Sequence, residues 1–141
     1  GDVLIHGLED TNLENRIAAI KSLGSIKYIP SVSKLNNVAI SEDSQQERLA
    51  AIISLGQIKD KSSIKVLIES LDDEEANIRW DAALSLYKMG NNSGMKIIKN
   101  LLNRQYYTNY PNVDNNEVSN TILTVLALIS DKYEESFNNW N

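Results

Sequence analysis

The chain of 141 residues contains no cysteine and one histidine, His6. The absence of cysteine excludes a disulfide framework, a thiolate zinc site and a cysteine nucleophile. A single histidine argues against a histidine-rich metal cluster and against a serine–histidine relay. We therefore expect His6 to be a packed or surface residue rather than a metal ligand.

Basic residues are also in the minority, and the net charge at pH 7 is −5. A nucleic-acid surface needs clustered Lys and Arg to meet the phosphates, so the acidic balance argues against such a partner. No apolar run approaches the roughly 18 residues that a membrane span requires. The chain has no Gly-rich phosphate loop, and the four acids at 72–75 lack the alternating spacing of calcium ligands. The sequence thus predicts no catalytic residue, no cofactor and no metal site.

Arginine is rare as well, with four Arg against ten Lys, and three of the four stand in nearly the same context. Arg16, Arg48 and Arg79 each open a run with Ala three residues after the Arg, Ile or Ala four after it and Leu seven after it, and these runs begin 32 and 31 residues apart. A weaker fourth copy covers residues 118–129, after about nine inserted residues. A period in the low thirties indicates one supersecondary unit per repeat, stacked into a solenoid.

Each repeat has the pattern of two helices. Counted from the Arg, alanine or other apolar residues recur at positions three, four, seven and ten, which form one helical stripe. Segments of capping-box form precede the first two copies at 11–14 and 44–47, and Gly24 and Gly56 suit helix ends. Further amphipathic stretches lie at 29–40, 64–71 and 95–102. Because strand signals are nearly absent, we predict an all-α fold.

These runs, which continue as Gly-x-Ile in the first two copies and have an acid six residues before each Arg, resemble the HEAT-like repeat pattern Arg-x-x-Ala-Ala-x-x-Leu-Gly-x-Ile. The most similar variety is the short bacterial kind that also occurs in phycobilin lyases. The likeness is strong over three repeats and weak in the fourth, where Ser119 stands in place of the Arg and Val113 in place of the acid. The resemblance implies a right-handed α-α superhelix, a HEAT-like solenoid of about four helical hairpins.

On this reading the chain is a single HEAT-like repeat domain over 1–141, and we expect it to be a fragment of a longer solenoid. The expected repeats are 1–27, 28–59, 60–91 and 92–131, followed by the start of a further helix at 132–141.

The resemblance also implies a structural ladder in which acids and arginines bridge successive repeats. A planar guanidinium can hold two oxygen acceptors, which an ammonium cannot match, and this explains why arginine persists in a lysine-rich chain. The ladder residues are Asp10, Arg16, Glu42, Arg48, Asp73 and Arg79.

In a HEAT-like repeat the positions one and five after the Arg point towards the concave surface. Five of these six positions are apolar here, although polar residues are expected at freely exposed sites. An apolar strip with a polar rim commonly marks a partner site. The alternative is tight superhelical curvature that buries these side chains between helices. The predicted contact strip is Ile17, Leu49, Ile53, Trp80 and Leu84.

The insertion at 104–116 holds three of the six tyrosines, Tyr106, Tyr107 and Tyr110. Tyrosine binds partners at low entropic cost, so the insertion is a candidate secondary edge of the binding surface. The alternative is a loop that folds its tyrosines over the adjacent repeat.

The function that this sequence favours is a non-enzymatic protein-interaction or scaffold module, which binds another protein or a peptide on its concave face. We expect a monomer in isolation, with no nucleic-acid partner and no membrane span. The alternative is a chromophore-handling or small-molecule-handling subunit that resembles phycobilin lyases, and a third class is pure structural spacing. No signal peptide is visible, and the absence of cysteine fits either the cytoplasm or the periplasm.

Overall fold

The computed structural model describes residues 2–41 and 44–140, and the side chains of 2–41 and 44–138. The chain divides into two compact units, Gly1–Gly94 and Met95–Asn141, which we describe separately. The described residues form helices and turns and contain no strand, so the all-α prediction is confirmed.

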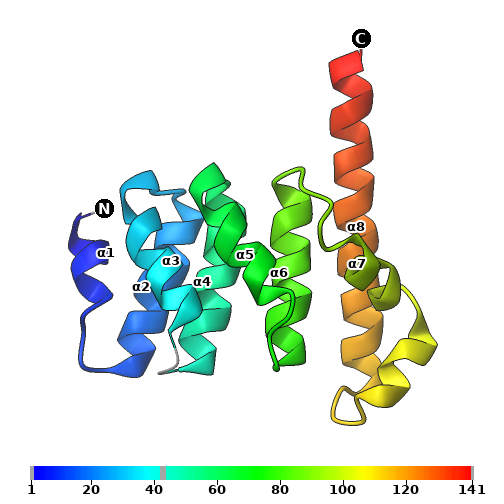
Figure 1. Cartoon of the computed structure of the whole chain (residues 1–141), viewed down its shortest axis with the longest axis horizontal. Helices are drawn as coiled ribbons and strands as arrows, with labels where there is room; N and C mark the ends of the chain where they lie inside the picture. The colour runs from blue at the N-terminus through cyan, green and yellow to red at the C-terminus, as the bar shows by residue number, and fades with distance from the viewer. Residues whose placement is uncertain (1, 42–43, 141) are drawn as a thin grey trace. The chain divides into compact units, whose positions relative to one another are not determined.

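The first unit alternates short and long helices (Figure 1). Three pairs of helices pack against each other, and each pair falls within one of the predicted repeats. The first pair is α1 (Asp2–Gly7) and α2 (Leu13–Ser25); the second is α3 (Val32–Ile40), preceded by the 3-10 turn η1 (Ile29–Ser31), and α4 (Gln45–Ile58); the third is α5 (Ile64–Ser70), preceded by η2 (Lys61–Ser63), and α6 (Ala76–Lys88).

The longer helices α2, α4 and α6 lie side by side and form one layer, while α3 and α5 contact each other in a second layer. The core lies between the layers, because the predicted apolar stripe of each long helix faces the shorter helices. In α4 this stripe is Ala51, Ile52, Leu55 and Ile58, and all four side chains are buried. Burying the larger ones, Ile52, Leu55 and Ile58, stabilises the fold by about 1.5–3 kcal/mol each.

Local side chains set the beginnings of the long helices. Asn12, rather than Thr11, caps α2, because its Oδ1 accepts the backbone N–H groups of Glu14 and Asn15 at 2.8 and 3.2 Å. Ser44 caps α4 as the capping-box pattern predicts, and its Oγ accepts the N–H of Glu47 at 3.2 Å.

Gly24 and Gly56 do not end their helices, contrary to the prediction from sequence. They lie within α2 and α4, which continue to Ser25 and Ile58. Each glycine instead allows the next long helix to approach closely. A Cβ at Gly24 would stand 2.7 Å from Ser54 Cβ, and one at Gly56 would stand 2.9 Å from Ser85 Cα.

The serines opposite these glycines tie the long helices together. Ser54 Oγ donates to the Ile20 carbonyl at 2.9 Å, and Ser85 Oγ donates to the Ile52 carbonyl at 2.9 Å. The glycine brings the neighbouring helix near enough for a serine hydroxyl to reach a main-chain carbonyl. The same contact is therefore repeated between α2 and α4 and between α4 and α6.

The second unit consists of α7 (Met95–Leu101), the 3-10 segment η3 (Arg104–Asn109) and α8 (Asn115–Trp140). Residues 115–140 form one continuous helix, so residue 132 is not a helix boundary as the sequence reading expected. The reason is that residues 118–140 contain neither Gly nor Pro to stop the helix. Among the described residues, no helix combines the length and the apolar character needed to cross a membrane.

Candidate functional site

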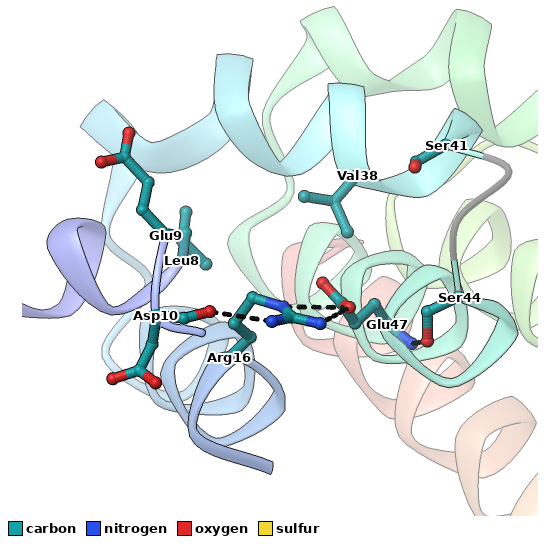
Figure 2. Close-up of a pocket in the computed structure, with 8 residues that line it drawn as sticks. All are labelled: Leu8, Glu9, Asp10, Arg16, Val38, Ser41, Ser44 and Glu47. Carbon is teal, nitrogen blue, oxygen red and sulfur yellow. Dashed lines mark hydrogen bonds and ion pairs between the residues drawn. The ribbon is translucent and has the colours of Figure 1, made fainter. Parts of the chain in front are cut away.

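A line of charged side chains runs along the edge of the first unit where α2, α4 and α6 begin. Arg16 donates from Nε and Nη2 to Glu47 Oε1 at 3.1 and 2.9 Å, and from Nη1 to the Asp10 carbonyl at 2.8 Å. Figure 2 shows the guanidinium between these two acceptors, with the Asp10 carboxylate turned away from it. One arginine thus links the start of its own helix to the next repeat.

The second and third repeats continue this arrangement through Asp73. Its Oδ2 accepts from Arg48 of the preceding repeat, its Oδ1 accepts the backbone N–H of Glu75, and its carbonyl accepts from Arg79 Nη1 at 2.8 Å. Arg48 also donates from Nε to the Ala39 carbonyl at 3.4 Å. The Arg48 and Asp73 side chains are 19% and 16% exposed, so their ion pair is largely shielded from water.

Two predicted ladder residues differ in their placement. Glu42 lies outside the described residues. The carboxylate of Asp10 accepts the backbone N–H of Asn12 at 2.8 Å, so only its carbonyl meets Arg16. Glu47, which pairs with Arg16, was recognised in the sequence as the last residue of a capping box and not as a ladder residue. The other two copies hold Asn15 and Ile78 directly before the Arg, so the sequence offers no repeated signal for this bridge.

The opposite side of the long-helix layer carries the predicted partner surface. On a helix, positions one, two, five and nine after the Arg lie opposite positions three, seven and ten, which face the core. The first group therefore faces away from α3 and α5, and we name this surface the α2–α4–α6 face. It is formed by Ile17, Lys21 and Ser25 of α2; Leu49, Ala50, Ile53 and Gln57 of α4; and Trp80, Asp81, Leu84 and Lys88 of α6.

A recess of about 260 Å³ opens on this face between α2 and α4. Its lining combines polar side chains, the apolar side chains of Ala50 and Ile53, and the ammonium group of Lys21. Its lining residues are Lys21, Ser25, Ala50, Ile53, Ser54 and Gln57. We name it the α2–α4 recess.

The predicted contact strip is exposed to different degrees. Ile53 is 37% exposed, whereas Trp80 is only 8% exposed and belongs to the buried residues. Ile17, Leu49 and Leu84 are half-buried. The strip therefore offers one accessible apolar side chain in the middle, flanked by partly covered ones.

Asp81 was recognised in the sequence only as a rim residue, yet it is the most perturbed acid of the described part of the chain. It is half-buried, and desolvation raises the pKa of its carboxyl from 3.8 to about 6, against a smaller lowering by the charge of Lys88. Its position on α6 corresponds to Ala50 on α4, which lines the α2–α4 recess. The sequence could not predict the burial of an acid at position two after the Arg, because Ala18 at this position in α2 is exposed whereas Ala50 in α4 is buried.

The three tyrosines of the insertion lie in and next to η3. Tyr107 is buried, its hydroxyl donates to the Leu101 carbonyl at 2.5 Å, and desolvation raises its pKa. Tyr106 and Tyr110 are half-buried, with ring centroids 5.3 Å apart and hydroxyl oxygens 3.2 Å apart. These contacts hold the three tyrosines against one another and against the end of α7.

Other recesses of the described part lie along the charged edge and in the second unit. The recess in Figure 2 holds about 340 Å³, and an equivalent one beside Arg48 and Asp73 holds about 440 Å³. A third, beside Arg104 and Tyr107, holds about 290 Å³. The described residues contain no group of three or more His, Cys, Asp or Glu side chains arranged to hold a metal ion.

Paired helices repeated about every thirty residues, joined by arginine–acid bridges and serine–carbonyl bonds, define a helical repeat protein. The family model of HEAT repeats matches residues 32–108, more than half of the chain, and the chain belongs to this family. The resemblance inferred from the arginine-centred runs is thereby confirmed.

No curated protein matches the chain. Among solved structures, a chain in the complex of CpcE and CpcF of phycocyanin lyase from Nostoc sp. PCC7120 is similar, with a TM-score of 0.62 and 22% identity. The match covers 73% of this chain and 42% of that one, so the chain spans less than half the length of this relative. At this identity the likeness shows the fold that the two share.

Proposed function

We propose that the chain is a non-enzymatic interaction module whose α2–α4–α6 face binds a segment of another protein. The observation that carries the proposal is the α2–α4 recess, where Ile53 leaves an apolar side chain accessible among polar groups. Accessible apolar surface surrounded by polar groups is typical of partner sites.

The shape of the site suits a protein segment. The recess is smaller than the roughly 300–1,000 Å³ typical of small-molecule pockets. It opens onto the surface of the layer that α2, α4 and α6 form together. A partner that lies across these helices gains contacts in more than one repeat. The half-buried Leu49 and Leu84 extend the apolar surface around Ile53.

The experiment compares Ile53→Asp with Ile68→Asp. Ile68 lies on α5 in the other layer and is 39% exposed, close to the 37% of Ile53, so both changes remove a similarly accessible apolar side chain. Immobilised wild-type chain is used to retain partners from the lysate of its own cells. We expect Ile53→Asp to lose them and Ile68→Asp to keep them. Equal retention by both variants would exclude the α2–α4–α6 face as the partner site.

Trp80→Glu is a poor test of the same face. Trp80 is buried, so a charge there is expected to destabilise the fold by several kcal/mol and to remove binding for that reason alone. Ile53 avoids this difficulty because a carboxylate at an accessible position changes stability little.

A second candidate function is the handling of a chromophore or another small molecule. The fold shared with a chain of the phycocyanin lyase complex favours it. This function requires a deep pocket and usually a second subunit. Adding bilin to the chain and recording the absorbance spectrum tests it: a red-shifted band that depends on the protein supports this candidate, and an unchanged spectrum removes it.

A further inference from the structure

We propose that the α2–α4–α6 face takes an extended peptide segment that carries an acidic residue, an apolar residue and a basic residue about three positions apart. The acid meets Lys21, the apolar residue covers Ile53, and the base meets Asp81. The inference rests on the proposed function and specifies the chemistry of the partner segment.

The positive end of this pattern is Lys21 on α2. Its side chain is exposed, it lines the α2–α4 recess opposite Ile53, and within the described residues it takes part in no ion pair. An unpaired ammonium on the wall of a recess with an apolar floor is complementary to a carboxylate that enters with an apolar neighbour.

The negative end is Asp81 on α6, the next long helix of the layer. It holds on α6 the position that Ala50 holds on the wall of the α2–α4 recess. Within the described residues its carboxylate has no hydrogen-bond or ion-pair partner, although the side chain is half-buried. A guanidinium or ammonium of the partner supplies the charge and the donors that this carboxylate lacks.

Lys88 is the charged group on α6 that competes with such a partner. It lies two helical turns beyond Asp81 on the same face, and its charge lowers the pKa of Asp81 without forming a contact ion pair. On the adjoining helix α4, the residues of the α2–α4–α6 face are Leu49, Ala50, Ile53 and Gln57, and none of them carries a charge. The site of Asp81 is therefore open to a cation from outside.

The spacing of the helices fits an extended ligand. Packed helices lie about 8–10 Å apart, and one turn of a polyproline II segment advances about 9 Å in three residues. Side chains three residues apart point the same way in this conformation, so successive ones meet α2, α4 and α6 in turn. A helical ligand would advance only about 4.5 Å over three residues and would miss this register.

Three capped synthetic peptides test the pattern: Glu-Ser-Ser-Leu-Ser-Ser-Arg, Arg-Ser-Ser-Leu-Ser-Ser-Arg and Glu-Ser-Ser-Leu-Ser-Ser-Glu. Fluorescence anisotropy measures their binding to the whole chain at low salt. We expect the first, mixed peptide to bind about threefold more tightly than the basic one and about tenfold more tightly than the acidic one, because the Asp81 contact is the less hydrated.

Substitutions in the protein then exchange these preferences. Lys21→Glu changes an exposed residue and is expected to make the basic peptide the best ligand. Lys65→Glu, at an exposed residue of α5 in the other layer, is the matched control and should leave the order of the three peptide affinities unchanged. Asp81→Asn is expected to remove the advantage of the mixed peptide over the acidic one, and circular dichroism verifies that each variant is folded.

Equal affinity for the three peptides, or no exchange with Lys21→Glu, would overturn the charge pattern while leaving the proposed face intact. Absence of binding by all three would overturn the extended occupant. Failure of the proposed function itself shows separately, when Ile53→Asp and Ile68→Asp retain partners equally.

Discussion

Two charged residues of the first unit, Arg48 and Asp81, are both partly buried, but within the described part of the chain only Arg48 has hydrogen-bond partners that compensate for the loss of water. Arg48 reaches a carboxylate and a main-chain carbonyl of neighbouring elements. Asp81 has burial and one more distant positive charge, and no hydrogen bond within the described residues. The first residue is expected to stabilise the fold, and the second to stabilise it only when protonated.

Arg48→Lys is expected to lower the free energy of unfolding by about 1–2 kcal/mol, since an ammonium cannot hold both acceptors in the geometry of a guanidinium. Arg104→Lys is the control, because Arg104 is exposed and donates a hydrogen bond from Nη2 to Ser119 Oγ at 2.7 Å, which an ammonium can replace. Urea unfolding monitored by circular dichroism measures both. An Arg48→Lys midpoint equal to that of the wild type would show that the bridge between repeats adds no stability.

Asp81 makes the stability depend on pH in a defined window. Its pKa in the folded chain is about 6, above the value of 3.8 for an ordinary Asp. The contribution that the protonated carboxyl makes to the free energy of unfolding is complete below about pH 4, and it is lost as the pH rises to about 6. Asp81→Asn is therefore expected to raise stability at pH 7 by about 2–3 kcal/mol and to flatten this part of the profile.

Thermal unfolding of the wild type and of Asp81→Asn between pH 4 and pH 8 checks this expectation. Asp72→Asn, an exposed acid before α6, serves as the control and should follow the wild-type profile. If Asp81→Asn also follows it, the carboxyl is not desolvated in the folded chain.

At the scale of the helix, a glycine and a serine that face each other set the distance between neighbouring long helices. Gly24 faces Ser54 and Gly56 faces Ser85, and each serine bonds to a carbonyl of the facing helix. In the third copy Tyr87 stands where the first two have glycine. The close glycine–serine contact is thus confined to the α2–α4 and α4–α6 pairs.

Gly56→Ala is expected to cost about 2–3 kcal/mol, because the new methyl group would stand 2.9 Å from the main-chain Cα of Ser85 and would push α6 away. Gly90→Ala is the matched comparison: no atom lies within 4 Å of its Cβ, and its φ of 80° alone is expected to cost about 1 kcal/mol. Chemical denaturation of the two variants gives both values. A smaller loss for Gly56→Ala than for Gly90→Ala would contradict the close-contact interpretation.

At the scale of the whole molecule, the bonds between repeats are concentrated in the first unit. The Arg16–Glu47 and Arg48–Asp73 bridges and both serine–carbonyl bonds lie within Gly1–Gly94. The second unit has 47 residues, a size at which the fraction of surface buried on folding leaves a chain only marginally stable. The first unit therefore has the means to fold alone.

A chain of residues 1–94 is expected to be helical and to unfold in one cooperative transition. A chain of residues 1–75 is the control, because it lacks α6 and with it the Ser85 bond and the buried stripe that covers α4. Far-ultraviolet circular dichroism during heating compares the two. Loss of cooperative unfolding in the 1–94 chain would mean that the first unit depends on the second.

The periodic features of the molecule could be predicted from the sequence. The three arginine-centred copies gave the α2, α4 and α6 helices and their apolar stripes, because side chains on a helix recur at fixed spacing whatever the surroundings. The HEAT family and the all-α class follow from that repetition. The assignment of residues to the α2–α4–α6 face rests on the same spacing.

Contacts between repeats depend on the tertiary structure instead. Glu47 rather than the Asp10 carboxylate meets Arg16, and Gly56 spaces two helices rather than ending one. Each of these outcomes depends on which helix lies next to the residue and on how closely it approaches. The local sequence contains no information on either.

The accessible surface was decided in the same way. Trp80 and Ile53 both belong to the predicted strip, at positions one and five after their arginines, yet Trp80 is buried and Ile53 is accessible. The sequence by itself therefore determined the helices, the repeat and the family. Only the packing of the helices decided which side chains remain in contact with water and hold an uncompensated charge, because desolvation is a property of the surroundings and not of the residue.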